Sequence, residues 1–439
     1  MRLPVSRLVF YALPAIPLAA LTLPLYIIVP TFYTETLGLS LASVGTALLV
    51  VRLFDAVNDP VIGWAADHWR PAFGRRRATF LLSLPVTALA AIMLFWPPLD
   101  AGPAYIVVWG GLLSLGYTAS IIPLTSWGAE MAGDYKERSR IAGFREGFTL
   151  IGTLVAIALP FAIGIDSGEG LHGLAALGLA VGSLLIVFGL VTIWRVPEPR
   201  EYSRSRLKLG EGLGHMARNR PFLRLIAAFL INGLANGIPA TLFLYFVSDR
   251  LGLPDLRGPL LFVYFLAGIA GMPLALAAAK RFGKHRAWCV AMLFTCAVFA
   301  FAPFIGEGDW LAFGALSVAT GLTLGFDLAL PAAIQADVID VDTAASGEQR
   351  SGLYFAAWSL ATKLSLAVAV GLAFPALGYF GFTAGGDNTP AALVALAVIY
   401  AWVPVVLKLS AVALMWNFPL TEDSQRDLRI RIEAGQPAS

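Results

Sequence analysis

Long apolar stretches recur along the whole chain and dominate its pattern of hydrophobic and polar positions. Twelve such runs are near or above the length of about 20 residues that a helix needs to cross a bilayer. Apolar residues follow one another continuously in these runs and do not alternate with polar residues, so the runs predict helices and not the strands of a barrel. We expect spans at roughly 8–33, 42–66, 78–99, 104–131, 142–164, 173–195, 222–248, 258–280, 287–306, 310–334, 352–380 and 390–418.

Composition and charge agree with a membrane protein and predict its orientation. Charged residues make up 13% of the 439 residues, about half the share of a soluble domain. Lys and Arg gather at 70–77, 136–140, 195–224 and 280–286. The positive-inside rule then predicts a multi-pass protein of the bacterial inner-membrane type with both termini in the cytoplasm. The first apolar run is too long for a signal peptide, so we expect it to be retained as a helix.

The longest polar segment divides the chain into two similar parts. We expect a six-helix half at 1–195, a cytoplasmic loop at 196–221, a second six-helix half at 222–418 and a cytoplasmic tail at 419–439. An internal repeat supports this division, because "FGRRRA" follows the second span and "FGKHRA" follows the eighth. Two equivalent halves are typical of secondary transporters, whose binding sites lie near the middle of the membrane.

Several other classes of protein find no support in the sequence. Cys289 and Cys296 share one apolar run, which indicates neither a disulfide framework nor a metal site. No complete P-loop or Ser-His-Asp arrangement is apparent, so we expect neither an enzyme nor a bound cofactor. The basic 196–221 loop is better explained by orientation and by anionic membrane lipid than by nucleic acid.

One charged stripe interrupts the second predicted span, in "VRLFDAVNDPVIG". On a helix, Arg52, Asp55 and Asp59 fall within an arc of roughly 60°, which must face the protein interior or an aqueous cavity. Two carboxylates one turn apart resist ionising together, and a bound cation or proton removes that penalty. Pro60 also frees the carbonyl of Ala56 as an acceptor. The stripe predicts a Na⁺ or H⁺ site, and a static ion-pair network is the alternative.

Several motifs resemble one transporter family. They are "DAVNDPVIGWAADHW" with "FGRRR", "GYTASIIPLTSWGAEM", "DYKERSRIAGFRE", "ALPAAIQADVIDVD" and "GLYFAAWSLATKL", in that order along the chain. Together they resemble the glycoside–pentoside–hexuronide:cation symporters, the melibiose-carrier family within the major facilitator superfamily. The resemblance implies a twelve-helix all-α fold, alternating access, and symport of a small sugar-like or glycoside-like solute with Na⁺ or H⁺. We expect the chain to function as a monomer.

The resemblance also implies roles for single residues. Asp55 and Asp59 match the carboxylates that bind the coupling cation, and Thr118 matches a polar residue near that cation. Residues that line, support or face the substrate cavity are matched by Tyr117, Trp127, Arg145 and Lys363. The cytoplasmic gating loop of the superfamily is matched by Gly63, Asp67 and Arg75.

Further candidates come from the positions of polar and aromatic residues. We add to the substrate cavity Arg52, Tyr26, Asp327 and Trp358, with packing as the alternative for the aromatic residues and a polar partner as the alternative for Asp327. Glu130 is a candidate for gating, and Lys408 either snorkels or forms an ion pair. We interpret Asp337, Asp340 and Asp342 as an acidic gating loop, with a metal cluster as the alternative. We expect interfacial anchors at Trp69, Trp96, Trp194, Trp288 and Trp310.

The sequence departs from the family at two positions. Sugar-transporting members carry an Asp in the first helix and another in the fourth, and the equivalent positions here are Ala19 and Ile121. Because two strong acceptors for sugar hydroxyls are missing, a melibiose-like galactoside is disfavoured as substrate. A lysolipid or amphipath carrier and a proton-coupled exporter of the same fold remain alternatives, and a membrane-embedded enzyme or receptor is the alternative outside the class.

Overall fold

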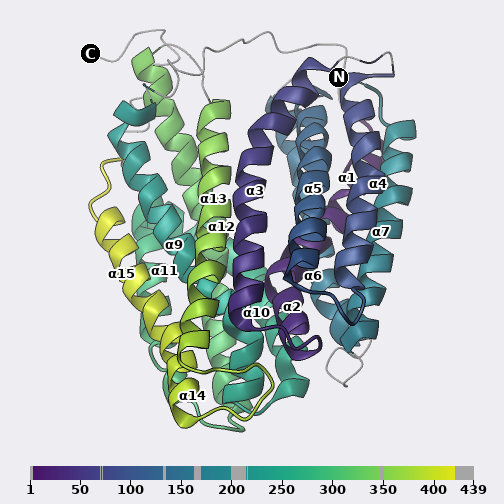
Figure 1. Ribbon diagram of the computed structural model, residues 1–439. Helices are drawn as coiled ribbons and strands as arrows, with labels where there is room; N and C mark the ends of the chain where they lie inside the picture. The colour runs from purple at the N-terminus through teal and green to yellow at the C-terminus, as the bar shows by residue number, and fades with distance from the viewer. Residues whose placement is uncertain are drawn as a thin grey trace. The chain divides into compact units, whose positions relative to one another are not determined.

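The computed structural model describes residues 3–69, 71, 73–131, 135–162, 170–198, 214, 216–346 and 351–420. Every regular element in these ranges is a helix (Figure 1). Within them, eleven helical stretches are long and apolar enough to cross a membrane, which confirms the all-helical membrane architecture. The fifth predicted span, 142–164, coincides largely with helix α6, extends past the described residues and is not among the eleven.

Two compact units divide the chain. The first comprises Met1–Arg204, Phe374–Tyr379 and Thr383–Asp387, and the second comprises Ser205–Ala373, Phe380–Phe382 and Asn388–Ser439. The helices that begin in the first unit are α1 (Val5–Ala12), α2 (Ala15–Glu35), α3 (Leu41–His68), α4 (Arg75–Phe95), α5 (Pro103–Met131), α6 (Tyr135–Ala162) and α7 (Gly170–Arg195). The boundaries expected for the two halves and for the tail remain a prediction.

The second unit contains the remaining helices. They are α9 (Arg220–Tyr245), α10 (Arg257–Phe282), α11 (Lys284–Phe299), α12 (Trp310–Ser346), α13 (Ser351–Tyr379), α14 (Pro390–Ala397) and α15 (Val403–Met415). The last turns of α13 group with the first unit. Short π-helical segments continue α9 over Phe246–Arg250 and join α14 to α15 over Val398–Trp402. Two short 3₁₀ turns complete the unit, at Pro254–Leu256 and Ala302–Phe304.

The first predicted span is broken where a single helix was expected. α1 ends at Ala12 and α2 begins at Ala15. Pro14 and Pro17 explain the break, because neither residue has a backbone N–H to continue the helical hydrogen-bond ladder. Most of the other predicted spans agree with single helices to within a few residues.

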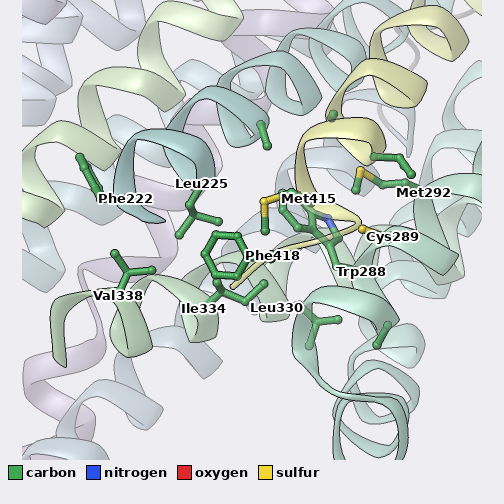
Figure 2. Close-up of a cluster of buried hydrophobic side chains, with 14 of the residues drawn as sticks. Phe222, Leu225, Trp288, Cys289, Met292, Leu330, Ile334, Val338, Met415 and Phe418 are labelled. Atoms are coloured by element: carbon green, nitrogen blue, oxygen red, sulfur yellow. The ribbon is translucent and has the colours of Figure 1, made fainter. Parts of the chain in front are cut away.

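A cluster of buried side chains holds the second unit together (Figure 2). Phe222 on α9, Trp288 on α11, Leu330 on α12 and Met415 on α15 all belong to it and are essentially inaccessible. Inside a membrane such contacts stabilise through van der Waals packing, because lipid tails are as apolar as the core. The prediction that Trp288 is an interfacial anchor is wrong. The four other Trp residues that we expected at the interface are exposed, at between 46% and 78%.

Helices α10 and α12 approach each other closely at four glycines: Gly268 and Gly271 on α10, and Gly321 and Gly325 on α12. A Cβ atom placed on Gly271 would lie 2.0 Å from the carbonyl oxygen of Leu322. Small residues are enriched at such membrane interfaces because they allow two backbones to touch. The side chains carried by α10 and α12 are therefore fixed relative to each other.

We predict that Gly271→Ala destabilises the protein by about 1–3 kcal/mol, because the new methyl group has no space. Thermal unfolding in detergent measures this. Gly147→Ala is the matched control, since Gly147 lies in α6 and a Cβ there meets nothing within 4 Å. A control that loses as much stability as Gly271→Ala, or a Gly271→Ala protein as stable as the parent, would contradict the close approach.

Candidate functional site

Two carboxylates on α3 are paired with two hydroxyls on α5, and the two helices pack side by side. The Ser114 hydroxyl donates to Asp55 Oδ1, and Thr118 Oγ1 donates to Asp59 Oδ1 at 2.8 Å. Both pairs step by four residues in the same direction, so α3 and α5 run parallel and in register. We call these four residues the carboxylate–hydroxyl ladder.

The ladder is buried and has a cation at one end. Arg52 Nη1 lies 3.3 Å from Asp55 Oδ2, and the two residues are only 7% and 3% exposed. Asp59 is half-buried. Two carboxylates one turn apart in so dry a setting raise each other's cost of ionisation, and Arg52 offsets part of that cost at Asp55. A monovalent cation or a proton at the ladder would lower the cost further.

The opposite face of α5 fixes the direction of the two hydroxyls. Gly116 packs so tightly on α4 that an added Cβ would lie 2.9 Å from the Cα of Thr87. Ser120 Oγ donates to Ser83 Oγ at 2.8 Å, which ties the same face to α4. Because Gly116 and Ser120 lie on the side of α5 away from Ser114 and Thr118, this packing holds the ladder hydroxyls toward α3.

Ser114, a residue of this site, was not predicted from the sequence, and neither was the buried Asn58 between the two acids on α3. Ser114 precedes Thr118 by one helical turn, and that spacing repeats the spacing of the two acids on α3. Asn58 is 7% exposed, and its side-chain nitrogen has no hydrogen-bond partner among the described residues. Searching each neighbouring helix for polar residues four apart would have found Ser114.

Other candidates in the first unit are in structural contacts. Trp127 is fully buried, and its Nε1 donates to the Pro197 carbonyl at 2.9 Å. Arg145 forms the local pair with Glu146, with Nη2 and Oε1 2.6 Å apart. Tyr117 is half-buried on α5, and Arg75 is buried at the start of α4. Their roles in the cavity or in gating remain predictions.

The surroundings of four candidates fall outside the described set. These are Tyr26 on α2, Gly63 and Asp67 on α3, and Glu130 on α5. Their proposed cavity and gating roles likewise remain predictions.

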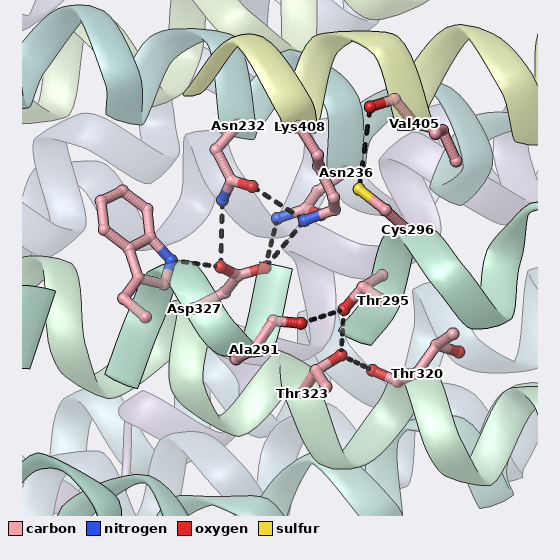
Figure 3. Close-up of polar contacts among 11 residues, drawn as sticks. Asn232, Asn236, Ala291, Thr295, Cys296, Thr320, Thr323, Asp327, Val405 and Lys408 are labelled. Atoms are coloured by element: carbon pink, nitrogen blue, oxygen red, sulfur yellow. Dashed lines mark hydrogen bonds and ion pairs between the residues drawn. The ribbon is translucent and has the colours of Figure 1, made fainter. Parts of the chain in front are cut away.

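Asp327 on α12 is the centre of a polar network in the second unit (Figure 3). Its Oδ1 accepts from Asn232 Nδ2 at 3.0 Å and from Trp288 Nε1 at 2.6 Å. Its Oδ2 accepts from Asn236 Nδ2 at 3.0 Å and from Lys408 Nζ at 3.2 Å. Four donors from α9, α11 and α15 thus saturate one carboxylate.

This network answers two open questions from the sequence. Lys408 pairs and does not snorkel, since its Nζ also donates to Asn232 Oδ1 at 2.8 Å. Asp327 has the polar partners that were the alternative to substrate contact, and in this arrangement its acceptor positions are used.

Two further cavity candidates lie on α13. Trp358 stacks on Phe229 with ring centroids 3.7 Å apart, and Lys363 is half-buried.

The interpretation of the acidic residues after the tenth span as a loop is wrong. Asp337 lies within α12, which continues to Ser346. Its two oxygens lie 2.7 and 2.6 Å from Lys284 Nζ, at the start of α11. The apolar run ends near 334, but the helix continues because its next residues remain good helix formers and Asp337 gains an ion pair. The Asp340 side chain and all contacts of Asp342 lie outside the described set.

We predict that Lys408→Met destabilises the protein by about 3–5 kcal/mol, because it leaves the buried Asp327 carboxylate without its counter-charge. Thermal unfolding in detergent measures the loss. The double variant Lys408→Met/Asp327→Asn should recover part of it, since no buried charge remains.

Arg220→Met serves as the control for removing an exposed positive charge. The ion pair would be irrelevant to stability if Lys408→Met behaved like this control. A double variant less stable than Lys408→Met would likewise contradict the account.

Comparison with known proteins gives a consistent result. Residues 10–422 match the family model described as MFS/sugar transport protein. The chain is 24% identical to the glucuronide carrier protein homolog of Escherichia coli K12, over 92% of this chain and 90% of the relative. It is 27% identical to the isoprimeverose transporter of Lactiplantibacillus pentosus, over 88% and 82% of the two chains. It is 22% identical to the human sodium-dependent lysophosphatidylcholine symporter 1, over 89% and 79%.

Solved structures share the fold at low sequence identity. A D-xylose–proton symporter superposes with a TM-score of 0.69 at 13% identity, over 96% of this chain and 98% of the other. An inward-facing bacterial homolog of the lysosomal transporter Spinster gives 0.66 at 16% identity, over 99% and 98%. The resemblance to the glycoside–pentoside–hexuronide:cation symporters is confirmed, and the chain belongs to the MFS/sugar transport protein family.

Proposed function

We propose that this protein carries a small polar solute of the glycoside class across the bacterial inner membrane together with a monovalent cation. The carboxylate–hydroxyl ladder is the observation that carries the proposal. It places two acids and two hydroxyls within one turn of each other, in a membrane-spanning helix pair. Intramembrane acids in transporters commonly mark ion or proton pathways. The names of the relatives support a coupling ion, since one of them is a sodium-dependent symporter.

The cation site would use oxygen atoms from both helices. Asp55 and Asp59 supply negative charge, and the hydroxyl oxygens of Ser114 and Thr118 each keep lone pairs while they donate. Asn58 lies on the same helix, between the two acids. Its Nδ2 atom is buried without a hydrogen-bond partner in the described chain, so a solute that offers an acceptor there would recover free energy. Na⁺ and H⁺ both suit carboxylates, and we propose either as the coupling ion.

Coupling follows from reciprocal affinity. A cation that favours one conformation of the protein raises the affinity of any solute that favours the same conformation, by the same factor. Moving an unbalanced charge through a medium of low dielectric constant costs free energy. A cation that neutralises the two carboxylates therefore lowers the free-energy cost of a conformational change that moves α3 and α5. Cation binding is thereby linked to solute binding without direct contact between the two ligands.

The names of the relatives support the proposed class of solute, and one residue on each of α2 and α5 disfavours one kind of sugar within it. Glucuronide and isoprimeverose appear in the names of two relatives. Ala19 is buried on α2 and Ile121 is half-buried on α5, so neither position offers a carboxylate to sugar hydroxyls. We therefore propose a glycoside that is recognised through amides, hydroxyls and aromatic faces, and not a melibiose-like galactoside.

A lysolipid or amphipath carrier is the second candidate. Helix α2 is apolar along most of its length, with no acid before Glu35, which suits an acyl chain better than a sugar. A relative with this type of substrate matches most of the chain. Uptake assays with radiolabelled glycosides and lysophospholipids in parallel separate the two candidates. A proton-coupled exporter would instead show efflux driven by an inward proton gradient.

We predict that Na⁺ or Li⁺, but not K⁺ at equal ionic strength, raises the melting temperature of the purified protein. A ligand that binds only the folded state adds about 2.7 kcal/mol when its concentration is about 100 times Kd. Asp55→Asn and Asp59→Asn should each abolish the effect. If H⁺ is the coupling ion, cation selectivity is absent, and the pH dependence of melting disappears in Asp59→Asn.

Asp255→Asn is the matched control, since Asp255 is exposed in the short 3₁₀ turn Pro254–Leu256. It should respond to every ion like the parent. If Asp55→Asn and Asp59→Asn also match the parent in every ion and at every pH, the two aspartates are structural and the proposal fails.

A further inference from the structure

A pocket of about 550 Å³ opens in the second unit where α10 ends and α11 begins. Its lining includes a basic set, which we call the cationic side: Lys280, Arg281, Lys284 and Arg286. It also includes an apolar set, which we call the apolar side: Leu276, Leu330, Ile334, Phe418 and Leu420. None of these residues belongs to the ladder or to the Asp327 network.

The cationic side carries an excess of positive charge. Asp337 is the single carboxylate among the lining residues, and both of its oxygens bind Lys284. Lys280, Arg281 and Arg286 are exposed. Arg281 lies over the ring of Phe282, 5.4 Å from its centroid, at the boundary between charged and apolar surface.

The internal repeat shows what this kind of helix start binds. Gly74 precedes α4 and Gly283 precedes α11, with φ, ψ of 114°, 140° and 82°, 150°. At α4 a carboxylate occupies the helix N-terminus: Glu198 accepts from the backbone N–H groups of Arg76 at 2.8 Å and Arg77 at 3.2 Å. Helix N-termini favour anions because their first N–H groups lack partners and the helix dipole is positive there.

Among the described residues of the second unit, no carboxylate takes this place. "WRVPE" at 194–198 follows α7, and the corresponding "WNFPL" at 416–420 follows α15. Leu420 therefore stands in the place of Glu198, and it lines the pocket. The backbone N–H groups of His285 and Arg286, equivalent to those of Arg76 and Arg77, have no acceptor among the described residues. The helix start that binds an anion in one unit opens into a cationic pocket in the other.

His285 points independently to a ligand. Its side chain is 8% exposed and lines the pocket, yet it makes no hydrogen bond within the described chain. Among the described residues its one ring neighbour is Phe418, at 6.1 Å between centroids. The imidazole can therefore donate a hydrogen bond to an acceptor that enters the pocket.

We propose that this pocket binds the phosphate group of an anionic membrane phospholipid. The phosphate would accept hydrogen bonds from the first turn of α11 and from the basic side chains, and an acyl chain would follow the apolar side. Leu276 and Phe282, on membrane-spanning α10, are 55% and 58% exposed and extend that apolar surface outward. Free phosphate would use only the basic residues, so a lining that is both basic and apolar favours a lipid. Basic pockets at helix ends suit such head groups.

The test measures lipid binding by the full-length, delipidated protein in detergent. Native mass spectrometry follows the titration of phosphatidylglycerol, with phosphatidylcholine and inorganic phosphate in parallel. We expect selective binding of phosphatidylglycerol to the parent, and binding about tenfold weaker to Leu420→Glu, which supplies the missing carboxylate. Arg286→Gln should also weaken binding and serves if Leu420→Glu folds poorly. Arg220→Gln, which removes an exposed charge elsewhere, should bind like the parent.

Three results overturn the proposal. The first is that phosphatidylglycerol binds Leu420→Glu and Arg286→Gln as tightly as it binds the parent. Inorganic phosphate could compete at the same concentration as the lipid, which would assign the site to a free anion. Binding could appear only in Glu422→Gln/Asp423→Asn, which would show that an acid of the chain's own C-terminal segment occupies the pocket.

Discussion

An ionised carboxylate inside a membrane protein must be balanced, because the surrounding medium does not solvate charge. The structure meets this constraint in two ways. Asp327 receives four donors, one of them the ammonium group of Lys408, and its charge is fixed in place. Asp55 and Asp59 are one turn apart, and neutral hydroxyls bond them to α5. The first arrangement stabilises a fold, and we propose that the second serves as a site for a mobile ion.

Small residues make both arrangements possible. Gly116 brings α5 against α4, which directs Ser114 and Thr118 toward α3. Gly271 and its neighbours bring α10 against α12, the helix that carries Asp327. Because lipid provides no hydrophobic driving force between helices, close backbone contact supplies much of the packing energy. Polar side chains can then be aligned over one or two turns with the precision that hydrogen bonds require.

The sequence predicted most of the fold because membrane spans are set by a simple constraint of length and polarity. It also singled out Asp55 and Asp59, since charges inside apolar runs are conspicuous, and the family resemblance singled out Thr118. It failed where partners come from distant segments. Ser114 resembles any helical serine until α3 is placed beside it, and Trp288 resembles an interfacial anchor until Asp327 is found within 2.6 Å. Asp337 was misread because the end of an apolar run is not the end of a helix.

The two units also differ at the helix start that the internal repeat gives to both. The two units use the same glycine-led helix start, which Glu198 completes in one unit, while Leu420 stands at the equivalent position in the other. We propose that this difference gives the second helix start a different ligand.

The most direct test of the central claim is infrared difference spectroscopy of the purified protein, on exchange of K⁺ for Na⁺ and on lowering of the pH. If the ladder binds the coupling ion, the parent shows a change in the carboxyl bands with one of these two steps, and Asp55→Asn and Asp59→Asn each remove part of it. If the difference spectra of both variants are identical to that of the parent, the coupling ion binds elsewhere and the central claim is wrong.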